Sequence, residues 1–173
     1  MTRFQRVMVT GGCGFIGSNL VRMLLAESTA HVTNLDLLTY AGNPENLAEI
    51  AADPRYRFVC GDVADPKHVA DAADGCDVIL HLAAESHVDR SIEDAETFIR
   101  TNVYGTRTIL EEGRRRGLRV VVVSTDEVYG ALQTVEDEPF RETTPLAPNS
   151  PYSASKAGGD LLARAYHHTH GSD

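Results

Sequence analysis

The sequence predicts a doubly wound α/β fold, in which a parallel sheet of the Rossmann type carries helices on both faces. Five apolar runs of strand length alternate with helix-like segments along the chain. The runs are rich in valine and nearly continuous, which is typical of parallel strands buried on both faces. A glycine-rich segment directly follows the first run and opens the first helix. With 173 residues and a hydrophobic content of 42%, the chain is long enough for one domain with its own core.

The strands are predicted from short runs that end at polar or turn residues. The first run reads Gln-Arg-Val-Met-Val-Thr and ends at a glycine, the second ends at Asp36, and the last holds four consecutive valines before Ser124. Short β-branched runs between turn residues are typical of strands. We expect strands at residues 5–10, 31–36, 56–60, 77–82 and 119–124.

Proline, serine and basic residues mark the limits of the predicted helices. Pro44, Pro66 and Pro151 stand close to helix starts, where the missing N–H is harmless, and Ser150 can cap the last helix. The basic run at 114–116 fits a helix C-terminus. We expect helices at residues 15–27, 44–52, 66–73, 91–116 and 151–169, and one long connection at 127–150. A connection of this length is usually functional or disordered, and we expect its acidic stretch to form a flexible tip.

Composition and charge exclude several classes of function. The net charge of −9 argues against nucleic acid and against an anionic membrane surface as partners. The chain lacks both the apolar run of a signal peptide and a stretch of about 18 apolar residues, so we expect neither export nor a membrane span. Cys13, Cys60 and Cys76 are odd in number and lack Cys-x-x-Cys spacing, which favours reduced thiols in a cytoplasmic protein. The histidines at 167–170 have no cysteine or carboxylate support nearby, so no metal site is expected.

A dinucleotide-binding motif is predicted between the first strand and the first helix. Gly12, Gly14 and Gly17 fit G-x-G-x-x-G, and Gly11, Gly14 and Gly17 fit the related G-x-x-G-x-x-G. Glycines permit a tight turn and close backbone approach, while the N–H groups at the helix start can bind a pyrophosphate. Asp36 ends the second strand, where its carboxylate can accept hydrogen bonds from the adenosine ribose hydroxyls.

Asp36 also predicts which dinucleotide is bound. Leu37 and Leu38 follow it, so no arginine is placed to pair with a 2′-phosphate, which the carboxylate would repel. Asp62, at the end of the third strand, is placed to approach the adenine edge, although a carboxylate there could equally cap a helix. The predicted cofactor is therefore NAD rather than NADP.

Tyr152 and Lys156 form the candidate oxidising pair. They stand four residues apart in a predicted helix and therefore share one face. An ammonium group nearby favours the phenolate, so we expect Lys156 to lower the pKa of Tyr152. Such a pair is a weak indication alone, because a surface tyrosine beside a solvated lysine is common. Thr125, Asp126 and Glu127 strengthen it, because they follow an apolar strand and so lie at the carboxyl edge of the sheet, where open α/β folds bind ligands.

Seven stretches of the sequence carry a resemblance to a known family. They are GGCGFIGSNL at 11–20, DLLTYAGN at 36–43, GDVAD at 61–65, LAAESHVDRSI at 82–92, TNVYGT at 101–106, STDEVYG at 124–130 and PNSPYSASKAGGD at 148–160. With them the chain resembles, over essentially its whole length, the nucleotide-sugar 4,6-dehydratases within the extended short-chain dehydrogenase/reductases, particularly those that act on dTDP-glucose. Related epimerases and decarboxylases share the glycine motif but generally lack the Asp-Glu pair after the threonine.

The resemblance implies a reaction that joins a temporary oxidation to an elimination of water. Tyr152 is expected to take the proton of the sugar 4-hydroxyl while hydride leaves C4 for NAD⁺, and Thr125 to hydrogen-bond the same oxygen. Glu127 is then expected to remove the C5 proton, and Asp126, as the protonated partner, to protonate the departing 6-hydroxyl. Hydride returns to C6 and a 4-keto-6-deoxy sugar results. Lys156 is also expected to bond the nicotinamide ribose.

Further contacts follow from the resemblance. Ser86 is expected at the sugar, His81 is expected to be a satisfied strand histidine, and His87 and Arg90 to be structural or partner-contact groups; the apolar residues at 82–84 could equally be core. The expected cofactor-binding residues are Gly11, Gly14, Phe15, Ile16, Gly17, Asp36, Leu37, Leu38, Thr39, Asp62, Val63, Leu82, Ala83, Ala84, Ser86, Thr101, Tyr152 and Lys156. The expected substrate-binding residues are Ser86, Thr125, Asp126, Glu127 and Tyr152.

The chain departs from the family at its end. It stops at Asp173, soon after the predicted helix that carries Tyr152 and Lys156, so residues 1–173 are expected to be one NAD-binding domain that carries the catalytic residues. The half that in relatives completes the sheet and binds the base and diphosphate is expected to be missing from this sequence, which we interpret as a fragment of a longer protein or else as a truncated form. Three interpretations of function stay open: an enzyme acting on dTDP-glucose, a 4,6-dehydratase of a UDP- or GDP-sugar, and a truncated NAD-binding module without turnover. Relatives dimerise through the helices at 91–116 and 151–169, so a homodimer is expected.

Overall fold

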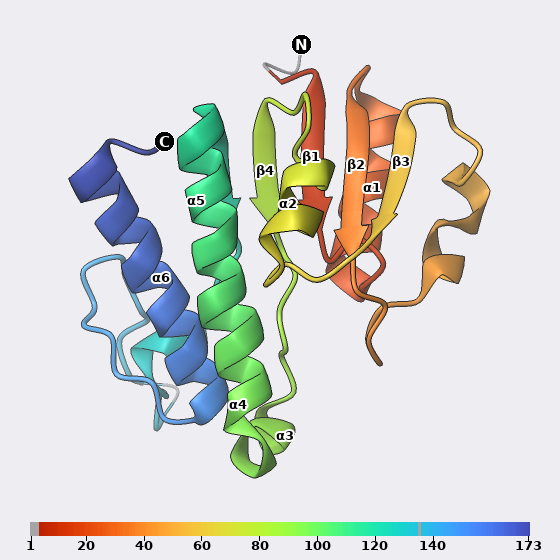
Figure 1. The fold of residues 1–173 in the computed structure, drawn as a ribbon. Coiled ribbons are helices and arrows are strands. Elements are labelled where there is room, and N and C mark those ends of the chain that lie inside the picture. The colour runs from red at the N-terminus through yellow and green to blue at the C-terminus, as the bar shows by residue number, and fades with distance from the viewer. Residues whose placement is uncertain (1–3, 135) are drawn as a thin grey trace.

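A five-stranded parallel sheet forms the centre of the protein (Figure 1). The computed structural model describes residues 4–134 and 136–173. The first three residues, which belong to the segment where no export signal is expected, and one residue of the long connection lie outside the described residues. The strands stand in the order β3-β2-β1-β4-β5, and all four pairings are parallel. Their bounds are β1 (Arg6–Thr10), β2 (His31–Asp36), β3 (Tyr56–Cys60), β4 (Val78–His81) and β5 (Arg119–Val122). The predicted fold class is confirmed, with β4 and β5 ending one or two residues earlier than expected.

The helices lie between the strands, as the alternating pattern predicts. The α-helices are α1 (Phe15–Glu27), α2 (Pro66–Ala72), α3 (Val88–Glu93), α4 (Ala95–Phe98), α5 (Thr106–Arg116) and α6 (Pro151–His170). Two 3-10 helices, η1 (Pro44–Ile50) and η3 (Asp126–Tyr129), and a π-helical segment, η2 (Ile99–Gly105), complete the described elements. Ser150 caps α6 through a capping box with Ser153, and Pro151 stands in the first turn, as expected. The basic run at 114–116 forms the last turn of α5, which Gly117 ends with a φ of 67°.

The single helix expected at residues 91–116 is wrong, because this stretch is divided. α3 ends at Glu93, and the non-helical backbone of Asp94 (φ −138°, ψ 82°) interrupts the helix. The Asp94 carboxylate then caps α4 by accepting a hydrogen bond from the Thr97 N–H at 3.3 Å. The π-helical turns of η2 follow before regular α-helix resumes at Thr106. The helix at 44–52 is likewise corrected, since it is the 3-10 helix η1.

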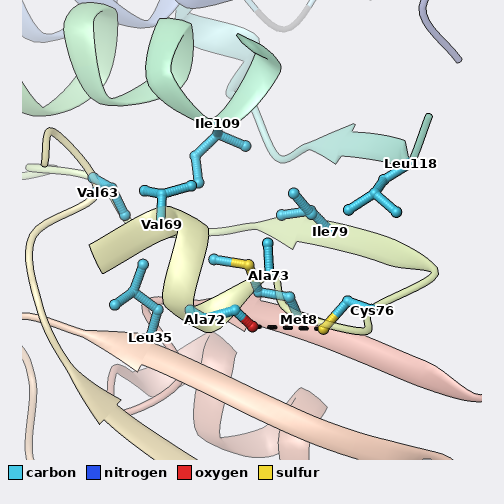
Figure 2. Close-up of a cluster of buried hydrophobic side chains, with 10 residues drawn as sticks. All are labelled: Met8, Leu35, Val63, Val69, Ala72, Ala73, Cys76, Ile79, Ile109 and Leu118. Carbon is cyan, nitrogen blue, oxygen red and sulfur yellow. Dashed lines mark hydrogen bonds between the residues drawn. The ribbon is translucent and has the colours of Figure 1, made fainter. Parts of the chain in front are cut away.

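Two apolar clusters hold helices against the two faces of the sheet. One face packs α2 and α5 through Val69 and Ile109 against Met8 and Ile79, as Figure 2 shows. The alternate residues of the strands, such as Val9, face α1 and η1 on the other side. In Figure 1, α2 and α5 lie in front of the sheet and α1 behind it, and α6 packs beside α5. Helices therefore cover both faces, as predicted.

Burial on both faces holds for the central strands but not for the edge strands β3 and β5. Val121 is 43% exposed and Val123, just beyond the strand, is 40% exposed. The register pairs Leu80 with Val121, which places Val121 on the α1 face of the sheet, where α1 covers β1 and β2 rather than β5. The expectation of complete burial is therefore wrong at this edge, because a valine-rich run does not reveal whether a helix covers it.

The connection at 127–150 folds back against η3. The Ala147 N–H donates to the Val128 carbonyl at 3.0 Å, and the rings of Tyr129 and Phe140 lie 5.5 Å apart. The acidic stretch forms a local turn, in which the Asp137 carboxylate accepts hydrogen bonds from the N–H groups at 133 and 134. The expected flexibility of this tip stays a prediction.

Candidate active site at the carboxyl edge of the sheet

A cavity of about 450 Å³ lies at the carboxyl ends of the strands. The chain leaves β1 towards β2 on one side, and returns after β3 to place β4 on the other side of β1. Ligands of doubly wound folds bind at such a switch point between neighbouring strands. The cavity is lined by Gly11, Gly14, Phe15, Ile16, Gly17, Leu35, Asp36, Leu37, Thr39, Ala41, Gly42, Gly61, Asp62, Val63, Leu82, Ala83, Ala84, Glu85, Ser86, Thr101, Val123, Ser124, Tyr152 and Lys156.

The glycine loop forms the floor of the cavity under the start of α1. Gly11 has a φ of 71°, and a Cβ there would lie 2.8 Å from the backbone of Ala83. A Cβ on Gly17 would collide with the carbonyl oxygen of Gly11. Gly14 precedes α1 without a side-chain cap, so no side chain covers the N–H groups of the first turn. This open, positively polarised helix start suits a bound pyrophosphate.

Asp36 is held at the opposite end of the loop by two backbone groups. Its carboxylate accepts hydrogen bonds from the N–H groups of Cys13 and Leu38, both at 2.8 Å. Each carboxylate oxygen keeps a further lone pair for a ligand hydroxyl. Leu38 was expected to contact the cofactor, but it does not line the cavity. It packs against the core on the α1 face, and its backbone has a positive φ of 56°.

Asp62 lines the cavity and does not cap a helix. Its carboxylate accepts hydrogen bonds from the Ala64 N–H at 2.7 Å and from Arg100 at 2.6 Å. The residue that caps α2 is Asp65, whose side chain accepts from the Lys67 N–H. The two interpretations of Asp62 are thus separated, and the one that places it at the cavity is supported.

Tyr152 and Lys156 lie on one face of α6 and both line the cavity. Tyr152 is 9% exposed and meets the edge of the Phe98 ring, with the ring centroids 6.3 Å apart. Lys156 is 7% exposed, and its Nζ donates to the Val123 carbonyl at 2.7 Å. The expected fall in the pKa of Tyr152 is not found. Burial raises the pKa of this phenol, and the carboxylates of Glu127 and Asp126 raise it further, while a hydrogen bond with Thr125 lowers it.

Thr125, Asp126 and Glu127 do not line the cavity, but they lie beside it. They follow Val123 and Ser124, which do line it, and they begin the 3-10 helix η3. The Thr125 hydroxyl accepts the Glu127 N–H at 3.3 Å, so the threonine caps this turn. Asp126 is exposed and Glu127 half-buried. Because the charges of Asp126 and Glu127 raise the pKa of Tyr152, and Thr125 hydrogen-bonds it, these three residues lie near the tyrosine at one end of the cavity.

A buried chain of hydrogen bonds connects the floor of the cavity to α6. The hydroxyl of Thr10 accepts the N–H groups at 82 and 83, so it donates to Nδ1 of His81 at 2.7 Å. Nε2 of His81 therefore carries the proton and donates to Thr106, whose hydroxyl donates to the Asn102 carbonyl at 2.6 Å. Burial, together with the Lys156 charge, lowers the pKa of His81 to about 3, so the ring is neutral. His81 is a satisfied strand histidine, as predicted.

Asn102 ends this chain by holding two segments with one amide. Its side chain accepts the Glu85 N–H at 2.9 Å and donates to the Glu85 carbonyl at 2.8 Å. The same amide donates to the Ser155 hydroxyl at 2.9 Å, next to Lys156 on α6. The π-helical segment η2 thus fixes the cavity wall at Glu85 relative to the helix that carries the candidate oxidising pair.

Comparison with known proteins places this site in a family. The family model described as GDP-mannose 4,6 dehydratase matches residues 8–173. The chain belongs to this family. The resemblance to nucleotide-sugar 4,6-dehydratases that the sequence carries is thereby confirmed.

Relatives of this 4,6-dehydratase family agree over nearly the whole chain. A dTDP-glucose 4,6-dehydratase of Streptomyces griseus is 56% identical over 171 residues, covering 96% of this chain and 51% of that protein. The crystal structure of DesIV, a dTDP-glucose 4,6-dehydratase from Streptomyces venezuelae solved with NAD bound, is 55% identical with a TM-score of 0.93, covering 98% of this chain and 53% of that one. The chain spans about half the length of the curated relatives it matches.

The fold extends beyond dehydratases. A UDP-glucose 4-epimerase of Thermus thermophilus, solved in complex with NAD, is 35% identical with a TM-score of 0.84, covering 96% of this chain and 52% of that one. The fold therefore does not decide the reaction, which has to be argued from the site.

Several lining residues were missed by sequence reasoning. They are Leu35, Ala41, Gly42, Gly61, Glu85, Val123 and Ser124. Most are neighbours of predicted positions, but Glu85 is a buried carboxyl whose pKa is raised by burial and lowered by the Arg90 charge. Arg90 stacks over the Tyr40 ring at 4.2 Å, which supports the structural role expected for it.

Metal and membrane sites are absent from the part of the chain that the structure describes. No group of three or more metal-ligating side chains occurs among residues 4–134 and 136–173. No helix within the same residues is both long and apolar enough to cross a membrane. The three cysteines are free thiols, with Cys13 and Cys76 buried and Cys60 exposed.

Proposed function

We propose that the chain is the NAD-binding and catalytic half of a 4,6-dehydratase that converts dTDP-glucose to dTDP-4-keto-6-deoxyglucose. The observation that carries the proposal is that one cavity holds the glycine loop and Asp36 at one end and Tyr152 with Lys156 at the other. Thr125 and the carboxylates of Asp126 and Glu127 stand beside the tyrosine, as a coupled oxidation and elimination requires.

The residues present fit NAD. The glycine loop is packed closely against the start of α1, because a Cβ at Gly17 would collide with the Gly11 carbonyl, and the uncapped start of α1 offers N–H groups for a pyrophosphate. The Asp36 carboxylate is buried and fixed by two N–H donors, so it can accept ribose hydroxyls without moving. No arginine follows Asp36, which favours NAD over NADP. When bound, NAD⁺ supplies a hydride acceptor for C4 of the sugar and later returns the hydride to C6.

The oxidation depends on Tyr152. Its phenolate takes the proton of the sugar 4-hydroxyl as hydride leaves C4, and Thr125 holds the same oxygen through its hydroxyl. Because burial raises the pKa of Tyr152, the phenolate needs a positive charge nearby. Lys156 has two N–H donors left after its bond to Val123, and they are available to the tyrosine and the cofactor ribose.

The elimination depends on the acid pair. With a ketone at C4, the C5 proton becomes acidic, and Glu127 removes it while Asp126 protonates the departing 6-hydroxyl, so that one water leaves. Glu127 then returns the proton to C5 as hydride reaches C6. Opposite duties require different protonation states of the two carboxyl groups. The half-buried position of Glu127 and the exposed position of Asp126 give them different surroundings.

The test is mass spectrometry of dTDP-glucose after incubation with the chain and NAD⁺. We expect a product lighter by one water, and we expect Asp126→Asn to block dehydration while leaving NAD binding intact. Parallel incubations with UDP-glucose and a GDP-sugar decide between nucleotides. A chain that binds NAD but forms no product from any of the three sugars would support the alternative of an NAD-binding module, which is kept open because the chain spans half the length of its relatives.

The assembly and location belong to the same proposal. We expect a homodimer through the helices at 91–116 and 151–169, because η2 and α6 carry the exposed apolar side chains Ile99, Tyr104 and Leu161. Light scattering of the parent and of Leu161→Glu tests it, and a parent that is monomeric at high concentration would contradict it. The three free thiols support a cytoplasmic location.

A further inference from the structure

Two consecutive residues just after β5 bind two residues that lie one turn apart in α6. The Val123 carbonyl accepts a hydrogen bond from Lys156 Nζ at 2.7 Å. The Ser124 hydroxyl donates to the Asp160 carboxylate at 2.6 Å. Lys156 and Asp160 are four residues apart, so they lie on the same face of α6. The strand end that leads into Thr125 is thus tied to α6 at both positions.

Lys156 carries an ammonium group that is largely buried from solvent. It is 7% exposed, and burial lowers the pKa of its ammonium. Its bond to Val123 offers a neutral carbonyl rather than an opposite charge. The cost of burying an ammonium is reduced when an anion stands beside it.

The groups around Lys156 leave one candidate for that anion. On β4, His81 is neutral and gives no counter-charge. On η3, the charges of Asp126 and Glu127 raise the pKa of Tyr152 but are not among the causes that shift the pKa of Lys156. Among the described residues, the carboxylate whose charge raises the pKa of Lys156 is Asp160.

We propose that Asp160 is a positioning residue of the active site: it is the counter-ion that keeps Lys156 protonated, and Ser124 holds its carboxylate in place. The half-buried Asp160 carboxyl has a pKa that burial raises and that the Ser124 hydrogen bond and the Lys156 charge lower, so the ionised form depends on these partners. The significance for catalysis rests on the proposed function, in which a protonated Lys156 favours the phenolate of Tyr152. The charge interaction between Asp160 and Lys156 does not depend on it.

The chain allows a direct measurement because it has two lysines, Lys67 and Lys156. With ¹³C-labelled lysine, the Cε resonances of both are followed by NMR as pH is raised, and Lys67→Arg assigns them. Lys67 is exposed and serves as the internal reference. We expect Asp160→Asn to move the Lys156 midpoint to lower pH, because the anion that favours the ammonium is lost while Ser124 keeps a hydrogen-bond acceptor.

Three matched variants sharpen the test. Asp160→Glu keeps the charge and should restore most of the midpoint, and Ser124→Ala, which removes only the hydrogen bond that holds the carboxylate, should lower it by less than Asp160→Asn does. Asp74→Asn makes the same chemical change at a residue whose side chain is 77% exposed and should leave the Lys156 midpoint unchanged. A Lys156 midpoint in Asp160→Asn equal to that of the parent overturns the proposal. So does a fall as large in Asp160→Glu, because the effect would then be steric.

The reciprocal measurement guards against a variant that does not fold. An unfolded chain moves the Lys156 midpoint up towards that of Lys67, in the direction opposite to the loss of a counter-ion. Should Asp160→Asn unfold, the Asp160 carboxyl is titrated by ¹³C NMR in Lys156→Met, where we expect its midpoint to rise; an unchanged midpoint overturns the proposal. Neither titration uses turnover, so a chain that fails to dehydrate any sugar can still pass or fail this test.

Discussion

Replacing Asn102 with alanine should lower the free energy of unfolding by more than the loss of a few side-chain atoms suggests, because buried hydrogen bonds are lost with them. The Asn102 side chain, in a residue that is 2% exposed, makes three hydrogen bonds: two with the backbone of Glu85 and one with the hydroxyl of Ser155. Alanine leaves the Glu85 N–H and carbonyl buried without these partners. Each such group costs about 1–3 kcal/mol, so we expect the free energy of unfolding to fall by about 3 kcal/mol.

Urea unfolding followed by far-ultraviolet circular dichroism measures this loss. The matched control is Asn19→Ala, which removes an exposed amide whose hydrogen bond to the Phe15 carbonyl is 2.8 Å long; we expect a change within about 0.5 kcal/mol there. Affinity for NAD should also fall in Asn102→Ala, because Glu85 lines the cavity. A loss of less than about 1 kcal/mol would refute the reasoning, since it would mean that water or a shifted backbone satisfies Glu85 at little cost.

Three further predictions concern the loop, the buried histidine and the core. Gly17→Ala should abolish measurable NAD binding in a fluorescence titration, because the new Cβ collides with the Gly11 carbonyl; parent-like affinity would contradict this. His81 has a folded pKa of about 3 against an ordinary 6.5, so the unfolded chain binds a proton that the folded chain does not, and stability should fall as pH drops through this window. Urea midpoints of His81→Gln should show a shallower fall, and an equal slope would argue against a neutral buried ring. Ile109→Ala, at a fully buried position, should cost about 2–5 kcal/mol in urea unfolding, and Ile92→Ala at an exposed position much less.

Patterns that are local in the sequence predicted the parts of the site that are formed within one helical turn or at the end of one strand. Gly17 and Asp36 were found because a glycine loop and the end of the next strand have fixed places in this fold. Tyr152 and Lys156 were found because helical spacing puts them on one face. In each case the residues that define the feature are near in sequence or attached to neighbouring strands.

Features that depend on long-range contacts could not be predicted in this way. Asn102 binds partners 17 and 53 positions away, and no local pattern reveals them. Leu38 was assigned to the cofactor with its neighbours, but it packs against the core and does not line the cavity. The pKa of Tyr152 was expected to fall because the lysine was considered alone; burial and two carboxylates act in the opposite direction.

The incompletely covered edge of the sheet has a consequence for handling the protein. β5 presents Val121 and the adjoining Val123 to solvent, and an exposed apolar edge strand is a template for pairing with other chains. The ion pair of Arg119 with Asp173 places charges at the start of this strand, where they oppose pairing with another chain. Aggregation at high concentration should therefore depend on ionic strength, and Arg119→Ala should make the chain less soluble without altering the cavity.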